Sequence, residues 1–320
     1  MTGDVLPDPL LNVEGMARRE RRGRYRVAPV DITLRRGEIL GILGANGAGK
    51  TTLLRLLSGT LAASEGRIQV AGFDLYDAPE PARAQIGYLP ESPPLYTEQT
   101  VRESLHFAGQ LHRLTGRDRD RRVRRMLVAC GLDGWANGLI AQLSLGYRKR
   151  VGIAQALLHE PALVILDEPT ASLDPIQARA IRRLIQRMGR DRATVLATHI
   201  LTEIEQVCHR VHMLYRGRTV FTGSLATLQT DDAHRLIIGL KGLTDPSPLT
   251  RLPGVRHVEA LGGQRYRLVT DGRDATRDGL LETAWRSGWQ PFELAAERPS
   301  LERLFLSRAL GGTADASATL

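Results

Sequence analysis

The sequence has few cysteines and no long apolar run. Its 320 residues include two cysteines, Cys130 and Cys208, which lie far apart without the spacing of a metal site. We therefore expect reduced thiols and no disulfide. No apolar run approaches the roughly 18–20 residues that span a bilayer, and the acidic, proline-broken residues 1–14 do not resemble a signal peptide. These absences predict a protein that stays in the cytoplasm.

Lysine is also scarce, although the chain is basic. Lysine and arginine together number 44 against 35 acidic residues, a net charge of +9, yet the lysines are only Lys50, Lys149 and Lys241. So uniform a preference for arginine is typical of genome composition, which weakens a nucleic-acid interpretation. Basic clusters such as residues 117–122 also contain acids. We interpret them as solvated faces, with a surface near anionic lipid or nucleic acid as the alternative.

One glycine-rich stretch matches the phosphate-binding loop G-x-x-x-x-G-K-[ST]. It follows an apolar run at 39–43 that predicts a buried strand, and it leads into an apolar stretch suited to a helix. In such a loop successive backbone N–H groups face phosphate oxygens, the lysine bridges the β- and γ-phosphates, and the hydroxyl after it binds Mg²⁺. The alternative is a glycine-rich turn that matches by chance, so the assignment needs support from further motifs. The stretch consists of Gly44, Ala45, Asn46, Gly47, Ala48, Gly49, Lys50, Thr51 and Thr52.

Strand-like and helix-like segments alternate over most of the chain. Apolar runs at 163–166 and 194–198 predict further buried strands, and helical spacing occupies 101 to about 138. This order predicts an α/β domain with a mostly parallel sheet. Beyond about residue 230, short strand candidates surround an amphipathic helix near 276–285, which indicates a small α+β appendage. We expect these parts: a flexible leader, 1–14; the main domain, 15–230, with a helical part at about 98–160; the appendage, 231–310; and a frayed tail, 311–320.

Two acids end the apolar strand at 163–166. A carboxylate at the carboxyl end of a strand beside a phosphate loop can hold Mg²⁺ directly or through water, and we assign this role to Asp167. Glu168 lies one residue further, where it could orient or deprotonate the attacking water. Upstream, Ser144 and Gly146 stand at the expected start of a helix, where a hydroxyl and free N–H groups can face an anion. Serine is also an ordinary helix cap, so that segment alone would be weak.

Together these motifs resemble, over about residues 25–225, the ATP-binding-cassette (ABC) ATPases. Residues 44–51 match Walker A, 143–147 the signature, 163–168 Walker B, 172–174 with Asp174 the D-loop, and His199 the switch histidine. The resemblance implies a P-loop (RecA-like) nucleotide-binding domain with an inserted helical subdomain, which binds ATP and Mg²⁺ and hydrolyses ATP. It also implies that two such domains close over two ATP molecules, so that Ser144 and Gly146 of one subunit cap the γ-phosphate held by the other.

Three positions depart from the family pattern. Leu145 and Tyr147 stand where the signature usually has glycine and glutamine. Glu91 stands where the family has the Q-loop glutamine, and its carboxylate could still bind Mg²⁺ or the water. The family stacks an aromatic side chain on adenine; the candidates here are Tyr25 and an arginine of the 21–24 run.

The departures are similar to those of one branch, the ATP-binding subunits of ABC-2-type exporters of the gliding-motility, multidrug and sodium-export groups. This implies a separate multi-pass membrane permease and a location at the cytoplasmic face of the cell membrane. It also implies a second nucleotide-binding domain, for which we favour a homodimer and leave pairing with a different ATP-binding subunit open. No specific nucleic acid is expected. The alternatives are a soluble ABC ATPase acting on nucleic acid or ribosomes and a degenerate cassette that only binds ATP. The transported substrate stays open.

Overall fold

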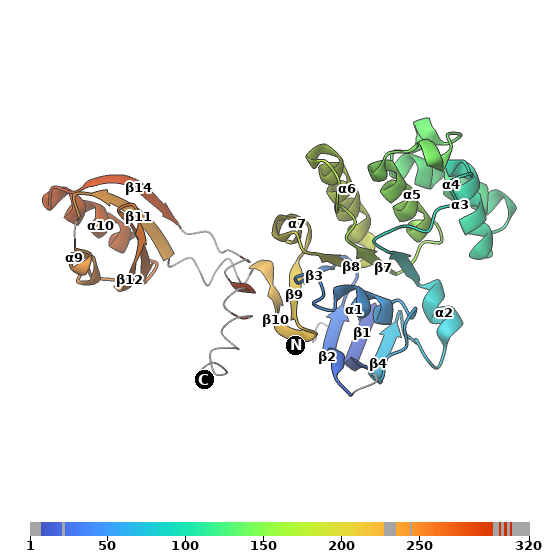
Figure 1. The fold of residues 1–320 in the computed structure, drawn as a ribbon, viewed down its shortest axis with the longest axis horizontal. Helices are drawn as coiled ribbons and strands as arrows, with labels where there is room; N and C mark the ends of the chain where they lie inside the picture. Colours follow the sequence, from blue (N-terminus) through green and yellow to red (C-terminus); the bar gives the residue numbers. More distant parts are fainter. Residues whose placement is uncertain are drawn as a thin grey trace, which may run out of the picture. The chain divides into compact units, whose positions relative to one another are not determined.

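The computed structural model describes residues 8–20, 23–226, 235–243 and 245–296, together with 301, 304, 305 and 308. The chain divides into two compact units, one running to Gly223 and resuming at Leu304, the other spanning Ser224–Arg303 (Figure 1). The sequence placed this division at 230/231 and counted residues up to 310 with the second part. The return to the first unit is visible at Phe305, whose ring meets the ring of Tyr215 edge-on with centroids 6.4 Å apart. The expected tail at 311–320 lies outside the described residues.

The first unit is built on a six-stranded sheet. Five neighbouring strands pair in parallel, and every residue of β3 and β7 is buried. Burial on both faces explains why these segments read as continuous apolar runs in the sequence. In spatial order the strands are β10 (Arg218–Ser224), β9 (Arg210–Tyr215), β3 (Ile39–Leu43), β8 (Ala193–Thr198), β7 (Leu163–Asp167) and β6 (Ile86–Leu89).

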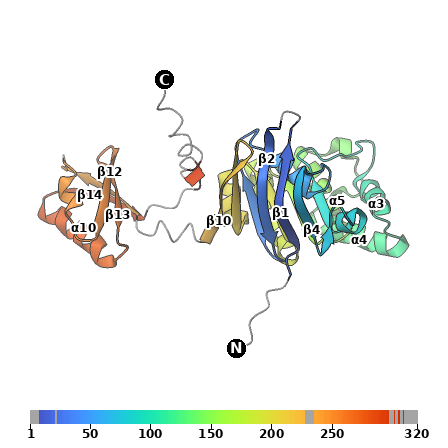
Figure 2. The same ribbon diagram turned by 90° about the horizontal axis from the view of Figure 1, so that it is seen from below.

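A second, antiparallel sheet packs on one side of the first unit (Figure 2). One apolar core joins it to the parallel sheet through α1 (Lys50–Leu57), whose four leucines are all buried. On the opposite face of the parallel sheet lie α6 (Pro175–Met188) and α7 (Leu201–Val207) (Figure 1). The strand order of the second sheet is β2 (Tyr25–Leu34), β1 (Leu11–Arg19), β4 (Glu65–Val70) and β5 (Phe73–Asp74).

The expectation of a flexible leader over residues 1–14 is wrong for residues 11–14, which begin β1. Leu11 and Val13 are buried in the core, and β1 pairs with both β2 and β4. The register of both pairings shifts after these residues, so the alternation of apolar and polar residues that identifies a strand is interrupted. Residues 1–7 of the expected leader lie outside the described part of the chain.

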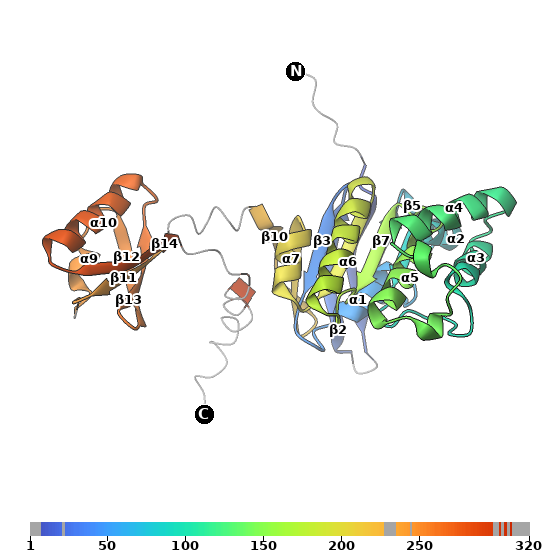
Figure 3. The ribbon, with the colours of Figure 1, turned by 90° about the horizontal axis from the view of Figure 1, so that it is seen from above.

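Helices α3 to α5 form the inserted helical part, set to one side of the sheets (Figure 3). Thr100 begins α3 with a capping box, in which its hydroxyl accepts from the Glu103 N–H and the Glu103 side chain accepts from the Thr100 N–H. Within the described residues no helix is long and apolar enough to cross a membrane. The helices are α2 (Pro79–Ala84), α3 (Val101–Leu111), α4 (Gly116–Ala129) and α5 (Leu145–Leu157).

Over residues 235–243 and 245–296, the second unit has an antiparallel four-stranded sheet and two helices, as the sequence predicted for a small α+β part. Its elements follow the order βαββαβ, the pattern of ferredoxin-like folds. Inward residues of β11 and β13 pack with Leu280 and Ala284 of α10 in a separate core. The elements are β11 (Arg235–Lys241), α9 (Ser247–Thr250), β12 (Val255–Gly262), β13 (Arg265–Thr270), α10 (Asp274–Arg286) and β14 (Gln290–Ala296).

Candidate functional site

The glycine-rich loop connects β3 to α1, as predicted. Gly49 precedes α1 with φ 108°, a backbone conformation that L side chains rarely adopt. At Gly44 the requirement is space, because an added Cβ would lie 2.6 Å from the carbonyl oxygen of Leu214. The loop can therefore curl tightly against β9.

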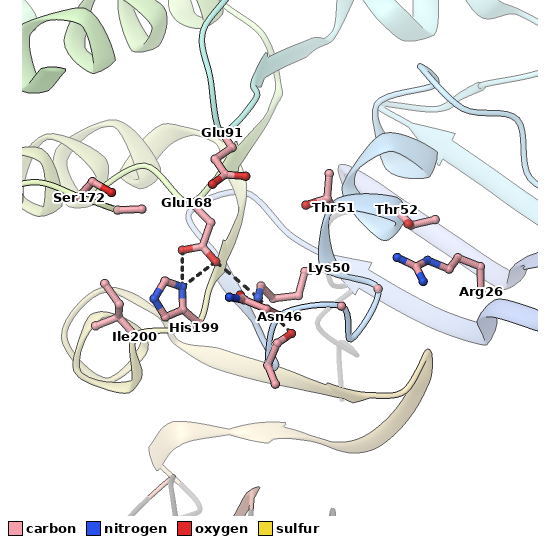
Figure 4. A pocket seen from close by; sticks show the side chains of 14 residues that line it. Arg26, Asn46, Lys50, Thr51, Thr52, Glu91, Glu168, Ser172, His199 and Ile200 are labelled. Atoms are coloured by element: carbon pink, nitrogen blue, oxygen red, sulfur yellow. Dashed lines mark hydrogen bonds and ion pairs between the residues drawn. The ribbon is translucent and has the colours of Figure 1, made fainter.

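A cavity of about 480 Å³ opens over this loop. Its other walls come from segments far apart in the sequence, and Figure 4 shows the side chains of Glu91, Glu168 and His199 facing the loop from the carboxyl ends of strands. Ala45, Asn46, Gly47, Lys50, Thr51 and Thr52 also line it. This is the place where ligands bind in open α/β sheets, beyond the carboxyl ends of the strands.

Lys50 is buried within the loop. Its ammonium group donates to the carbonyl of Gly44 at 2.8 Å and lies 3.4 Å from a carboxylate oxygen of Glu168. A buried ammonium needs such partners, and a phosphate chain in the cavity would offer it stronger ones. Lys50 is thus placed to exchange loop carbonyls for phosphate oxygens.

Glu168 is the central acid of the cavity. Its carboxylate is buried, and both oxygens lie 3.0 Å from Nδ1 of His199. Figure 4 shows the carboxylate between His199 and Lys50. A carboxylate so placed, beside the phosphate loop and the open cavity, can orient a water and accept its proton.

Asp167 ends β7 and is 1% exposed. Neither of its carboxylate oxygens has a hydrogen-bond partner of acceptable geometry. Burial raises the pKa of Asp167 above its ordinary value, and the neighbouring Thr51 hydroxyl opposes the rise. An unpartnered buried carboxylate next to a hydroxyl and a phosphate loop fits a divalent cation.

The described residues contain no group of three His, Cys, Asp or Glu side chains that could cage a metal by themselves. Mg²⁺ does not require such a cage, because it is commonly bound through one or two carboxylates, waters and substrate phosphates. Thr51 and Glu91 line the cavity, whereas Asp167 is not among its lining residues and lies beside the Thr51 hydroxyl. These three residues are therefore a suitable set for Mg²⁺ but not for a metal held by protein alone.

Ser144, Gly146 and Asp174 are not among the residues lining this cavity. Ser144 precedes α5, is exposed, and makes no capping hydrogen bond with its side chain, so the ordinary cap that was the alternative interpretation is absent there. Gly146 is buried against α6, where an added Cβ would lie 2.0 Å from Oε1 of Gln177. Asp174 caps α6 by accepting from the N–H groups of Ile176 and Gln177.

The structure does not bring Tyr25 to the cavity. The Arg19 guanidinium lies over its ring, 4.4 Å from the centroid, and also contacts its hydroxyl. Arg26 does line the cavity, and it also lines an adjoining hollow with Arg18, Arg19 and Thr52. The sequence alone could not single out Arg26, because several arginines lie close to it in the chain. Which of them faces the cavity depends on how β2 pairs in the sheet.

Sequence reasoning also missed Lys149, which is 3% exposed. It projects from α5 and donates to the backbone carbonyls of Glu91 and Glu168, the latter at 3.0 Å. Burial lowers the pKa of Lys149, and the surrounding carboxylates, Glu91 first, oppose that shift. The sequence did contain a signal for Lys149: lysine is so scarce in this arginine-rich chain that each lysine is a candidate for a specific role.

Comparison with known proteins gives a consistent result. The family model described as "ABC transporter" matches residues 27–171. The ABC transporter ATP-binding protein NatA of Bacillus subtilis is 36% identical over 204 residues, which cover 63% of this chain and 83% of NatA. The Nod factor export ATP-binding protein I of Rhizobium johnstonii is 33% identical over 287 residues, 89% of this chain and 90% of that protein.

A solved structure described as an ATP binding subunit of an ABC transporter superposes with a TM-score of 0.63 at 31% identity. The match covers 69% of this chain and 92% of that one. The matched share of this chain is about as long as the first unit.

Proposed function

Since this chain belongs to the ABC transporter family and is an ATP-binding, ATP-hydrolysing member of it, we propose that it powers export through a separate ABC-2-type membrane permease. The Nod factor export protein supports this, because its similarity extends beyond the ATP-binding unit over 89% of the present chain. The observation that carries the ATP-driven part of the proposal is the carboxylate of Glu168, held between Lys50 and His199 at the wall of the phosphate-loop cavity.

The chemistry follows from the positions of these side chains. The loop N–H groups bind the phosphates of ATP, and the ammonium group of Lys50 turns from the Gly44 carbonyl to the β- and γ-phosphates. Glu168 orients water toward the γ-phosphate and accepts its proton. His199 holds the Glu168 carboxylate by donating from Nδ1, and its ring lies in the wall of the cavity that would receive the γ-phosphate. Thr51, Asp167 and Glu91 would hold Mg²⁺, which neutralises charge on the phosphates when bound.

A second copy of this chain completes the site. Ser144 presents an exposed, locally unused hydroxyl at the start of α5, a 13-residue helix whose first N–H groups favour an anion. Such a pair of donors suits the γ-phosphate of ATP bound to the other subunit. We propose that ATP closes a homodimer in this way and that hydrolysis reopens it.

The permease would contact the helical part near residues 91–98 and 101–114. Exposed apolar side chains gather there, with Tyr96 53% and Leu111 69% exposed. An exposed apolar surface of this kind is typical of a protein–protein contact. Binding to a permease would place the chain at the cytoplasmic face of the cell membrane.

The test is co-expression of the tagged chain with an ABC-2-type membrane protein of the same genome. We expect both to co-purify in detergent and the ATPase rate to rise in the complex, whereas Tyr96→Ser with Leu111→Ser should release the permease without lowering basal hydrolysis. A chain that stays alone and binds DNA or RNA in a salt-sensitive, ATP-dependent manner would favour the nucleic-acid alternative instead.

A further inference from the structure

We propose that Lys149 is a positioning residue for hydrolysis, which fixes the backbone of Glu168 and connects it to the segment of Glu91. The proposal rests on the mechanism of ATP hydrolysis proposed above, in which Glu168 orients the attacking water. It adds a residue that keeps Glu168 in position. It comes from two backbone contacts of a buried ammonium group.

Glu168 needs such a support because its backbone is unusual. Its φ is +46°, in the left-handed region that a residue with a side chain seldom adopts. Such conformations persist only where the surroundings hold them, and they concentrate at functional sites. The direction of the Glu168 carboxylate depends on this turn.

Hydrogen bonds hold this turn on both sides of the Glu168 α-carbon. Its N–H donates to the carbonyl of Ala197 in β8 at 2.9 Å, and its carbonyl accepts from Nζ of Lys149 at 3.0 Å. The first bond continues the sheet. The second comes from a side chain of α5. The same carbonyl also accepts from the N–H of Ala171, but at 3.3 Å, so loss of the Lys149 ammonium group would remove the shorter of its two hydrogen bonds.

The same ammonium group also donates to the backbone carbonyl of Glu91, just beyond β6. Glu91 and Glu168 both line the cavity (Figure 4). The Lys149 side chain therefore joins two of its walls. A lysine suits this position because its compact ammonium carries three donors that can point at separate carbonyls, unlike the planar fork of arginine. A displacement of the Glu91 segment would therefore reach Glu168 through Lys149.

The test compares three purified full-length variants with the wild type. Lys149→Met keeps the length of the stem and removes the donors, Lys149→Arg keeps a donor, and Lys241→Met is the control at an exposed lysine of the second unit. We expect Lys149→Met to lower kcat about 10- to 100-fold, since a small misplacement of a reacting group has effects of this size. KM for ATP should stay within about threefold, because the phosphate loop is unchanged. Lys149→Arg should recover part of kcat, and Lys241→Met should match the wild type.

Hydrogen exchange gives a readout independent of turnover. The amide of Glu168 should exchange faster in Lys149→Met than in the wild type, while the amides of β3 should not. A wild-type kcat in Lys149→Met, or equal losses of kcat, ATP affinity and melting temperature in the Met and Arg variants, would overturn the proposal. If the wild type hydrolyses no ATP, the proposed function fails, and unchanged exchange at Glu168 would then separately overturn the role of Lys149.

Discussion

Replacing Glu168 by glutamine keeps the volume of the side chain nearly unchanged but removes its charge and its ability to act as a base. The amide keeps the shape of the side chain but cannot accept a proton from water, and it loses the charge that faces Lys50 at 3.4 Å and His199 at 3.0 Å. General-base catalysis contributes typically 10²- to 10⁴-fold. We therefore expect kcat to fall about 100- to 10,000-fold, equivalent to about 3–5 kcal/mol of activation free energy.

ATP binding should survive in Glu168→Gln, because removing a negative charge beside the phosphates does not weaken their attraction to Lys50. The assay is phosphate release at saturating ATP and Mg²⁺, with nucleotide affinity measured separately by a fluorescent ATP analogue. Glu205→Gln is the matched control, the same substitution at an exposed residue of α7. Turnover within threefold of the wild type in Glu168→Gln would refute the assignment of Glu168 as the base.

Three further predictions concern other residues. Glu91→Gln should keep most of the ATPase rate, because Lys149 contacts the Glu91 backbone carbonyl, which the substitution retains; a complete loss in the phosphate assay would show that the carboxylate has its own task. Arg26 lines the cavity, and we predict that its guanidinium stacks on adenine. Arg26→Ala should therefore raise KM for ATP about tenfold, whereas Tyr25→Ala should not; the reverse result would restore the tyrosine as the adenine platform. Burial lowers the pKa of His212 to about 4. As pH falls, this histidine therefore takes up its proton in the unfolded chain before it does so in the folded protein. The free energy of unfolding should fall by about 3 kcal/mol as pH drops from 6.5 to 4. Denaturant titrations of His212→Gln should give a flatter pH dependence, and an equal slope would contradict this origin.

The central site was predictable because its main residues lie in short contiguous motifs. Walker A residues 44–51 and the acids Asp167 and Glu168 are each contiguous, and buried parallel strands leave long apolar runs around them. The short strands of the second unit were found for the same local reason, whereas their spatial order depends on pairings between distant segments.

The missed features all depend on contacts across the chain. β1 is a strand because it pairs with β2 and β4, and its register shifts interrupt the alternation that would reveal it. Lys149 reaches carbonyls 58 and 19 residues away, and no spacing rule places a lysine of α5 beside Glu168. Tyr25 was a reasonable candidate as the aromatic nearest the loop, but its ring is occupied by Arg19.

The measurement that tests the account most directly is the molar mass of Glu168→Gln in solution, by light scattering, with ATP and Mg²⁺ and with ADP. We predict that the mass doubles with ATP and Mg²⁺ but not with ADP, because two phosphate loops close against two Ser144 segments. The double variant Glu168→Gln with Ser144→Arg should keep the mass of a single chain. A variant that binds ATP yet keeps the mass of a single chain would contradict the composite site.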